Sequence, residues 1–431
     1  MVVVFALVAL LVLAVLVTAN WYVWRRLFHD TTRGPGAARR AGAVLIAGGW
    51  ALAVGALVAE RTGAPFTLQR VLAWPGFLWL ALSIYLLLAL LAGEAVRPLL
   101  RRLLERRAAA RADADAVRPA APERVPAATA PPAVPERPAA PEPPAVPDGV
   151  LAGPLAGPTR RLFVSRVVGG TAAAAAVGTV GYGTYGVLRG PRVKRVTVPL
   201  AKLPRAAHGF RIAVVSDIHL GPVLGRGFAQ KVVDTVNSTQ ADLIAVVGDL
   251  VDGSVKDLGP AAAPLARLSA RHGAFFVTGN HEYFSGAEQW VEEVRRLGLR
   301  PLENARTELP HFDLAGVNDV AGEDEGQGPD YARALGDRDR SRACVLLAHQ
   351  PVQIHDAVRH GVDLQLSGHT HGGQLWPGSL LAGAANPTVA GLERYGDTQL
   401  YVSRGAGAWG PPTRVGAPSD ITVIELASRQ A

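Results

Sequence analysis

Three uncharged apolar runs fall within the first hundred residues of this 431-residue chain, at residues 2–19, 41–59 and 71–93. A helix needs about 20 apolar residues to cross the hydrocarbon of a bilayer, and each run is close to that length. Tryptophan and tyrosine residues lie near the ends of the runs, where aromatic side chains favour the membrane interface. These runs exclude an ordinary soluble fold here and predict a membrane domain of three transmembrane helices within residues 1–96.

Basic residues predict how these helices are oriented. Five arginines follow the first run within residues 25–40 and six follow the third within residues 97–111, whereas only Arg61 and Arg70 separate the second run from the third. Because arginine-rich flanks stay in the cytoplasm, we expect an external amino terminus and a cytoplasmic segment after the third helix. Residues 97–158 are predicted to be that cytoplasmic linker. It is first rich in arginine and then in proline and alanine, with 11 of the 32 prolines within residues 119–147.

Residues 159–190 admit two interpretations. Arg160 and Arg161 precede an uncharged stretch from Val167 to Leu188 that is rich in alanine and glycine. This pattern resembles a twin-arginine export signal, and it also fits a plain fourth transmembrane anchor. Both interpretations place residues 192–431 outside the cytoplasm. We therefore expect a multi-pass protein of the cell membrane whose C-terminal domain lies on the extracytoplasmic side.

The distribution of charge bears on the partners of the chain. Its net charge is +8, with 20 basic and 10 acidic residues up to residue 191, and 24 basic and 26 acidic residues beyond it. The excess positive charge lies in the apolar half, where it fits the flanks of membrane spans better than a nucleic-acid footprint. We expect the membrane as a partner and no nucleic acid. The single cysteine, Cys344, excludes an internal disulfide and a thiolate zinc site.

A different pattern begins at Phe210. Short apolar runs typical of buried strands alternate with stretches of helical spacing, which predicts an α/β domain within residues 192–431. Further apolar runs have no comparable helices between them, so a mixed sheet is expected. The expected strands are residues 211–216, 243–247, 274–278, 343–348 and 363–367, the expected helices are 228–236, 258–268 and 287–297, and the further runs are 312–317, 400–403 and 421–426.

Potential metal ligands follow nearly every predicted strand, and ligand sites of α/β domains gather at strand ends. Carboxylate, imidazole and amide groups together suit Mn, Fe or Zn. Each motif alone is weak evidence, but their joint occurrence in this order is very improbable by accident. The motifs are Asp217-Ile218-His219, Gly248-Asp249-Leu250-Val251-Asp252, Gly279-Asn280-His281-Glu282, His349-Gln350-Pro351 and Gly368-His369-Thr370-His371-Gly372-Gly373-Gln374.

Taken together, these motifs resemble the D-x-H, G-D-x-x-D, G-N-H-[ED], lone H and G-H-x-H pattern of the calcineurin-like metallophosphoesterase superfamily. The resemblance spans roughly residues 210–427. The G-H-T-H-G-G-Q motif and the segment from Val402 to Gly405 are similar to the bacterial membrane-associated branch related to cell-envelope phosphoesterases. The resemblance implies a four-layer α-β-β-α sandwich, in which two mixed sheets are flanked by helices.

The resemblance also implies two divalent metal ions, Mn, Fe or Zn, and a role for each motif residue. His281 would face the phosphate and Asp252 would orient it. One ion would take Asp217, His219 and His371, and the other Asn280, His349 and His369, with Asp249 bridging both.

Two neighbouring ions lower the pKa of a bridging water and clamp the phosphoryl oxygens. The sequence therefore predicts a membrane-anchored metallophosphoesterase, a phosphoric ester hydrolase in which a metal-bridging hydroxide attacks a phosphomonoester, phosphodiester or pyrophosphate bond. The expected substrate is a phosphorylated small molecule or a lipid- or envelope-linked compound.

A non-catalytic membrane sensor or scaffold that retains the phosphoesterase fold is the main alternative, and the complete set of ligands argues against it. A transporter is disfavoured because the predicted spans are nearly free of the polar groups that line an ion or substrate path.

Overall fold

The computed structural model describes residues 2–116 and 159–430, so the proline-rich part of the expected linker lies outside the described residues. The described residues form two compact units, one within residues 2–43, 87–116 and 159–173 and the other within residues 44–86 and 174–430. Helices α2 (Ala37–Arg61), α3 (Phe66–Ala116) and α4 (Arg160–Leu188) each contribute to both units.

Four helices among the described residues are long and apolar enough to cross a bilayer, namely α1 (Val2–Trp24) with the turn after it, α2, α3 and α4. Helix α1 continues into a π-helical turn at Arg25–His29. Helix α3 does not end after its apolar part but runs on to Ala116. The arginine-rich beginning of the expected linker is therefore helical, which agrees with the high helix propensity of arginine and alanine.

Polar contacts join the helices of the first unit at one end. Tyr22 lies 3.1 Å from the carboxylate of Glu94, to which Arg26 also forms an ion pair at 2.9 Å. Arg166 of α4 donates a hydrogen bond of 3.0 Å to the backbone carbonyl of Thr31. The end of α1, the middle of α3 and the start of α4 are thus linked through charged groups.

The second unit contains two six-stranded mixed sheets. In the first sheet the neighbours are, in order, β1 (Arg192–Leu200), β12 (Asp420–Ser428), β2 (Phe210–Val215), β3 (Leu243–Val247), β4 (Ala274–Val277) and β5 (Arg300–Pro301). In the second they are β10 (Gly391–Tyr395), β11 (Thr398–Val402), β9 (Leu364–Ser367), β8 (Ala343–Leu347), β7 (Phe312–Gly316) and β6 (Ala305–Glu308). Strands β2 to β5 run parallel, as do β7, β8, β9 and β11.

Alternating side chains of these strands face two different cores. In β3, Leu243 and Val247 join the core between the two sheets, whereas Ile244 and Val246 join the core beneath the helices. The second sheet is covered on its outer face in the same way, with Cys344 and Leu346 of β8 packed there. The helices of this unit are α5 (Arg226–Ser238), α6 (Val255–Ala262), α7 (Asn280–Ser285), α8 (Ala287–Arg296), α9 (Tyr331–Leu335), α10 (Ile354–Arg359) and α11 (Gly378–Ala385).

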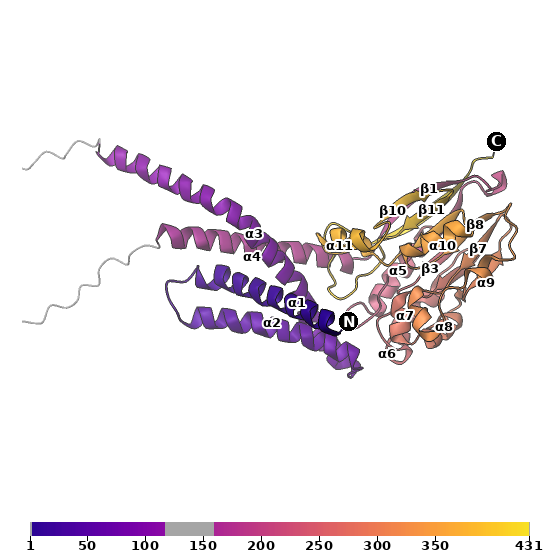
Figure 1. Ribbon diagram of the computed structural model, residues 1–431, viewed down its shortest axis with the longest axis horizontal. Helices are drawn as coiled ribbons and strands as arrows, with labels where there is room; N and C mark the ends of the chain where they lie inside the picture. The colour runs from indigo at the N-terminus through magenta and orange to yellow at the C-terminus, as the bar shows by residue number, and fades with distance from the viewer. Residues whose placement is uncertain (1, 117–158, 431) are drawn as a thin grey trace, which may run out of the picture. The chain divides into compact units, whose positions relative to one another are not determined.

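This arrangement is the expected four-layer α-β-β-α sandwich (Figure 1). The structure differs from the sequence-based expectation at several elements, since strands β1, β5, β6 and β10 and helices α7, α9, α10 and α11 were not predicted. Strand β1, which pairs with β12 along the edge of the first sheet, was not predicted, because its alternating basic residues belong to an exposed edge. The helix expected over residues 258–268 is α6 followed by a 3₁₀ turn at Ala263–Arg267, since Pro264 cannot donate an α-helical hydrogen bond.

Candidate metal centre

The predicted ligands lie in the loops that leave parallel strands. Asp217 and His219 follow β2, Asp249 and Asp252 follow β3, and Asn280 and His281 open α7 after β4. From the second sheet, His349 follows β8, and His369 and His371 follow β9. Because both sheets direct these strand ends to one edge of the sandwich, residues more than 150 positions apart in the chain meet there, as His219 and His371 do.

Five of these residues have a left-handed backbone, which is rare for residues other than glycine. The φ angles are 52° at Asp217, 49° at His219, 52° at Asp249, 73° at His369 and 52° at His371. Such conformations cost energy and persist at functional sites, where the surrounding structure enforces them. At Gly279, an added Cβ atom would collide with the carboxylate of Asp249, which explains the glycine before Asn280.

The first cluster consists of Asp217, His219 and His371, all buried. The Nε2 atom of His371 lies 3.3 Å from Oδ1 of Asp217 and 3.0 Å from Nε2 of His219. The other carboxylate oxygen of Asp217 is buried and has no hydrogen-bond partner within the described part of the chain. Burial lowers the pKa of His371 to about 4, so this ring is neutral and can act as a metal ligand.

The second cluster consists of Asp249, His349 and His369, with Asn280 beside it. The Nδ1 atom of His349 lies 2.8 Å from the carbonyl oxygen of Val247. A carbonyl only accepts, so Nδ1 carries the proton and a neutral ring presents a bare Nε2 lone pair. That Nε2 atom faces Oδ2 of Asp249 at 3.1 Å. A lone pair and a carboxylate oxygen this close need a positive charge between them, which is supplied either by a proton on Nε2 or by a metal ion.

The charges of this cluster agree with that requirement. Burial lowers the pKa of His349, but the carboxylates of Asp249 and Asp217 outweigh it and raise that pKa well above its ordinary value. Burial, reinforced by the charge of His349, lowers the pKa of His369 to about 4. Nδ1 of His369 lies 2.9 Å from the side-chain oxygen of Asn280, so these two predicted ligands are adjacent.

Asp249 lies between the two clusters. Its Oδ2 atom is 3.1 Å from Nε2 of His349 and 3.7 Å from Nε2 of His219. Its Oδ1 atom accepts a hydrogen bond of 2.9 Å from the backbone N–H of His281. The donor set, the unpartnered buried atoms and the central carboxylate together fit two divalent ions.

His281 lies at the edge of this centre. Its Nδ1 atom is 2.7 Å from Oδ1 of Asp252, and the same oxygen lies 2.9 Å from Nδ1 of His219. Burial lowers the pKa of His281, but its hydrogen bond with Asp252 and the charge of that carboxylate raise it to about 9. Asp252 therefore orients two imidazoles, whereas the sequence assigned it only one. The ring of His281 also packs edge-on against Phe284 and Trp409, with centroids 5.5 Å away in each case.

Two residues that hold the centre in place were not identified from the sequence. The buried carboxylate of Glu282 accepts backbone hydrogen bonds from Asp249 at 3.0 Å, Leu250 at 2.7 Å and Gly279 at 2.6 Å, which ties the loops after β3 and β4 together. Buried Arg414 donates to the carbonyls of His371 at 3.0 Å and Gly407 at 2.6 Å. The glutamate ends the Gly-Asn-His-Glu motif and could have been noticed there, whereas nothing local marks Arg414.

Comparison with known proteins agrees with this geometry. The family model for calcineurin-like phosphoesterases matches residues 210–373. A zebrafish "transmembrane protein with metallophosphoesterase domain" is 38% identical over 57% of this chain and 59% of its own length. An uncharacterized metallophosphoesterase of Aquifex aeolicus is 34% identical over 55% of this chain and 92% of its own length, and Bacillus subtilis YkuE, also uncharacterized, is 30% identical over 63% and 98%.

Among solved structures, a dimetal phosphatase from zebrafish aligns with 50% of this chain and 91% of its own, with a TM-score of 0.35 and 13% identity. The match covers almost the whole length of the two bacterial relatives, but only about 59% of the length of the zebrafish relative. The chain belongs to the calcineurin-like phosphoesterase family.

Proposed function

We propose that this protein is a membrane-anchored phosphoesterase that uses two divalent metal ions and acts on the extracytoplasmic side of the membrane. The observation that carries the proposal is the position of Asp249 between two clusters of buried ligands, with Nε2 of His349 lying 3.1 Å from its Oδ2 atom. One ion would be held by Asp217, His219 and His371, the other by Asn280, His349 and His369, and Asp249 would contact both.

When bound, such a pair of ions supplies an activated water and a clamp for the phosphoryl oxygens. The other residues of the site position the substrate and move a proton. Asp252 fixes Nδ1 of His281, which leaves Nε2 of that ring to meet the phosphate and to donate a proton to the leaving oxygen. Glu282 and Arg414 position the loops that carry Asp249 and His371.

Exposed apolar side chains near the centre support a lipid-linked substrate. Phe284 and Trp409 flank His281, and both are exposed. Helix α11 follows the His371 loop and carries Leu380 and Leu381, which are 74% and 78% exposed. Large apolar side chains that gather beside a polar site mark a surface that contacts lipid or another apolar partner.

The chain itself keeps this domain close to the bilayer. Predicted span α4 ends at Leu188 and β1 begins at Arg192, a connection that reaches only about 10–15 Å. Within the second unit, Tyr85 of α3 donates a hydrogen bond of 3.0 Å to the carbonyl of Trp376, just before α11. A phosphate ester held at the membrane surface would thus be within reach of the centre.

The test uses the full chain, supplied with Mn, Fe or Zn and reconstituted in phosphatidylcholine vesicles. Phosphate release is measured from phosphatidic acid in the same vesicles and from soluble p-nitrophenyl phosphate. Leu381→Glu should slow the lipid reaction at least tenfold and leave the soluble reaction unchanged, because it places a charge on the lipid-facing helix. Val358→Glu on α10, where valine is 39% exposed, is the matched control. Absence of turnover with every metal and substrate would favour the non-catalytic alternative.

A further inference from the structure

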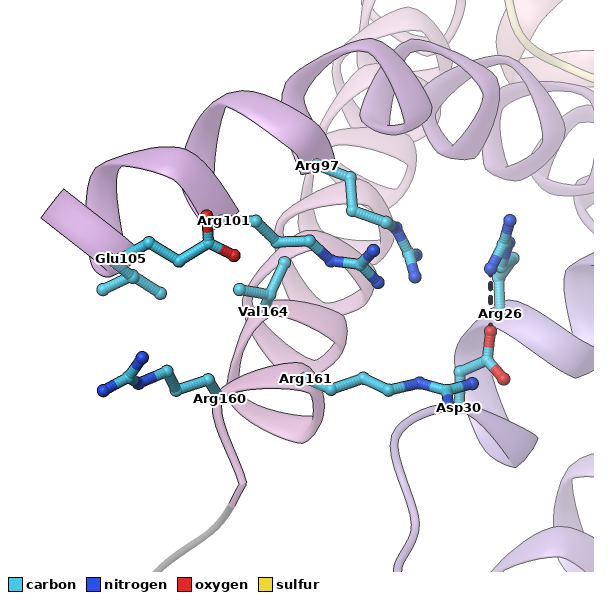
Figure 2. Close-up of a pocket in the computed structure, with 9 residues that line it drawn as sticks. Arg26, Asp30, Arg97, Arg101, Glu105, Arg160, Arg161 and Val164 are labelled. Carbon is cyan, nitrogen blue, oxygen red and sulfur yellow. Dashed lines mark hydrogen bonds and ion pairs between the residues drawn. The ribbon is translucent and has the colours of Figure 1, made fainter. Parts of the chain in front are cut away.

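The first unit contains a cavity of about 440 Å³ whose lining residues are mostly charged. It lies between the turn after α1, the later part of α3 and the beginning of α4 (Figure 2). Its volume is within the range of small-ligand sites. The lining residues are Arg26, Asp30, Arg97, Arg101, Leu104, Glu105, Arg160, Arg161 and Val164.

Positive charge exceeds negative charge in this cavity, with five arginines against two carboxylates. Arg26 is neutralised, since it forms ion pairs of 2.9 Å with Asp30 and with Glu94. Within the described part of the chain, Arg101, Arg160 and Arg161 form no ion pair. Figure 2 shows the side chains of Arg97, Arg101 and Arg161 extending toward Arg26 and Asp30, while Arg160 extends the other way.

Arg97 provides a second and independent observation. It is only 6% exposed, and its Nη2 atom lies 3.5 Å from Glu94, an ion pair longer than those of Arg26. Its Nη1 atom donates a long hydrogen bond of 3.4 Å to the hydroxyl of Ser165. Among the described residues, its buried Nε atom has no hydrogen-bond partner. A buried guanidinium with an unused donor is costly, and an acceptor bound in the cavity would remove that cost.

We infer that this cavity binds a phosphate group. Guanidinium groups offer paired donors that match phosphate oxygens, and arginine-lined pockets between membrane helices on the cytoplasmic side suit anionic headgroups. The topology expected from the basic residues puts the cavity at the cytoplasmic face of the membrane. The phosphate belongs either to an anionic phospholipid or to a soluble phosphate compound. Arg160 and Arg161, the pair that resembles an export signal, are among the residues that line it.

The test compares two matched pairs of variants of the full chain in detergent, with EDTA present so that the proposed metal centre does not retain phosphate. Arg101→Gln and Arg97→Gln/Arg101→Gln remove cavity charges and leave Arg160 and Arg161 intact for membrane insertion. Arg102→Gln and Arg102→Gln/Arg106→Gln remove the same charge from exposed positions of α3 that do not line the cavity. Native mass spectrometry measures bound phosphatidylglycerol against phosphatidylcholine, and calorimetry measures bound pyrophosphate.

Wild type and the control variants should bind one probe with equal affinity, and Arg101→Gln should weaken that binding about tenfold. If Arg101→Gln loses binding of phosphatidylglycerol, the ligand is a lipid headgroup. If it loses binding of pyrophosphate, the ligand is a soluble phosphate compound. Arg101 is exposed, so this single variant keeps the test valid if the double variant does not fold. Equal binding by wild type and Arg101→Gln, or an equal loss in Arg102→Gln, would overturn the inference whether or not the protein is a phosphoesterase.

Discussion

The Nε2 atoms of His219 and His371 face each other at 3.0 Å, although the two residues are 152 positions apart in the chain. Both imidazoles are buried, and Asp217 lies 3.3 Å from one of them. Nitrogen atoms so close together need a shared proton or cation, and a metal ion is the simplest way to satisfy a site that also contains carboxylates.

Asp249→Asn should lower the metal content of the purified protein from two ions per chain and nearly abolish turnover, because the change removes the negative charge placed between the two clusters. Elemental analysis and phosphatase assays measure the two effects. His360→Ala is the control, since His360 contacts Asp356 in α10 and lies outside every ligand cluster of the described residues. Two ions per chain in Asp249→Asn would show that this carboxylate is not a bridge.

His281→Ala should keep both metals and lose about 10²- to 10⁴-fold in rate, the usual contribution of a general acid or base. Proton donation by Nε2 predicts a smaller loss for p-nitrophenyl phosphate than for an alkyl phosphate, because nitrophenolate needs little protonation to leave. The measurement is kcat of wild type and His281→Ala on both substrates, with the metal content of each protein as the control. Equal losses would instead favour a contact with the phosphoryl oxygens, and a wild-type rate on both would remove His281 from the mechanism.

Glu282→Ala should destabilise the protein by about 3–5 kcal/mol, because it leaves three buried N–H groups without their acceptor. Urea unfolding monitored by tryptophan fluorescence provides the measurement. Glu288→Ala, which changes an exposed residue of the neighbouring helix α8, should alter stability by less than about 0.5 kcal/mol. Similar losses in the two variants would contradict the role assigned to Glu282.

Cys344 should not react with thiol reagents while the protein is folded. Burial in β8 raises the pKa of its thiol to about 12, so the reactive thiolate is scarce and inaccessible. A chromogenic disulfide reagent, followed by absorbance, should therefore detect no reactive thiol in the native protein and one thiol per chain after denaturation. Rapid labelling of the native protein would mean that β8 is not packed as described.

Protease added to intact spheroplasts should degrade residues 192–431 and spare the linker at residues 97–158, because arginines flank the first and third predicted spans. Protection of the C-terminal domain would contradict the proposed orientation. Replacing both Arg160 and Arg161 by Lys tests the twin-arginine interpretation separately. Export that survives this double change would favour the plain transmembrane anchor.

The sequence alone determined the elements that depend on local order. Short continuous apolar runs predicted β2, β3, β4 and β8, because strands buried on both faces need apolar residues at every position. The order of strands and motifs along the chain also placed the candidate ligands, since a motif that directly follows a strand must lie at the carboxyl end of that strand. The long uncharged runs likewise predicted helices suited to a membrane.

Only the tertiary structure decided what depends on contacts between distant segments. Local spacing cannot show that Asp252 pairs with His219 as well as His281, or that Arg414 secures the loop of His371. It did not reveal β1, whose partner β12 lies more than 200 residues away. Nor could it show that Arg97, Arg101 and Arg161 line one cavity. These relationships arise when the chain folds back on itself, because packing selects which side chains meet.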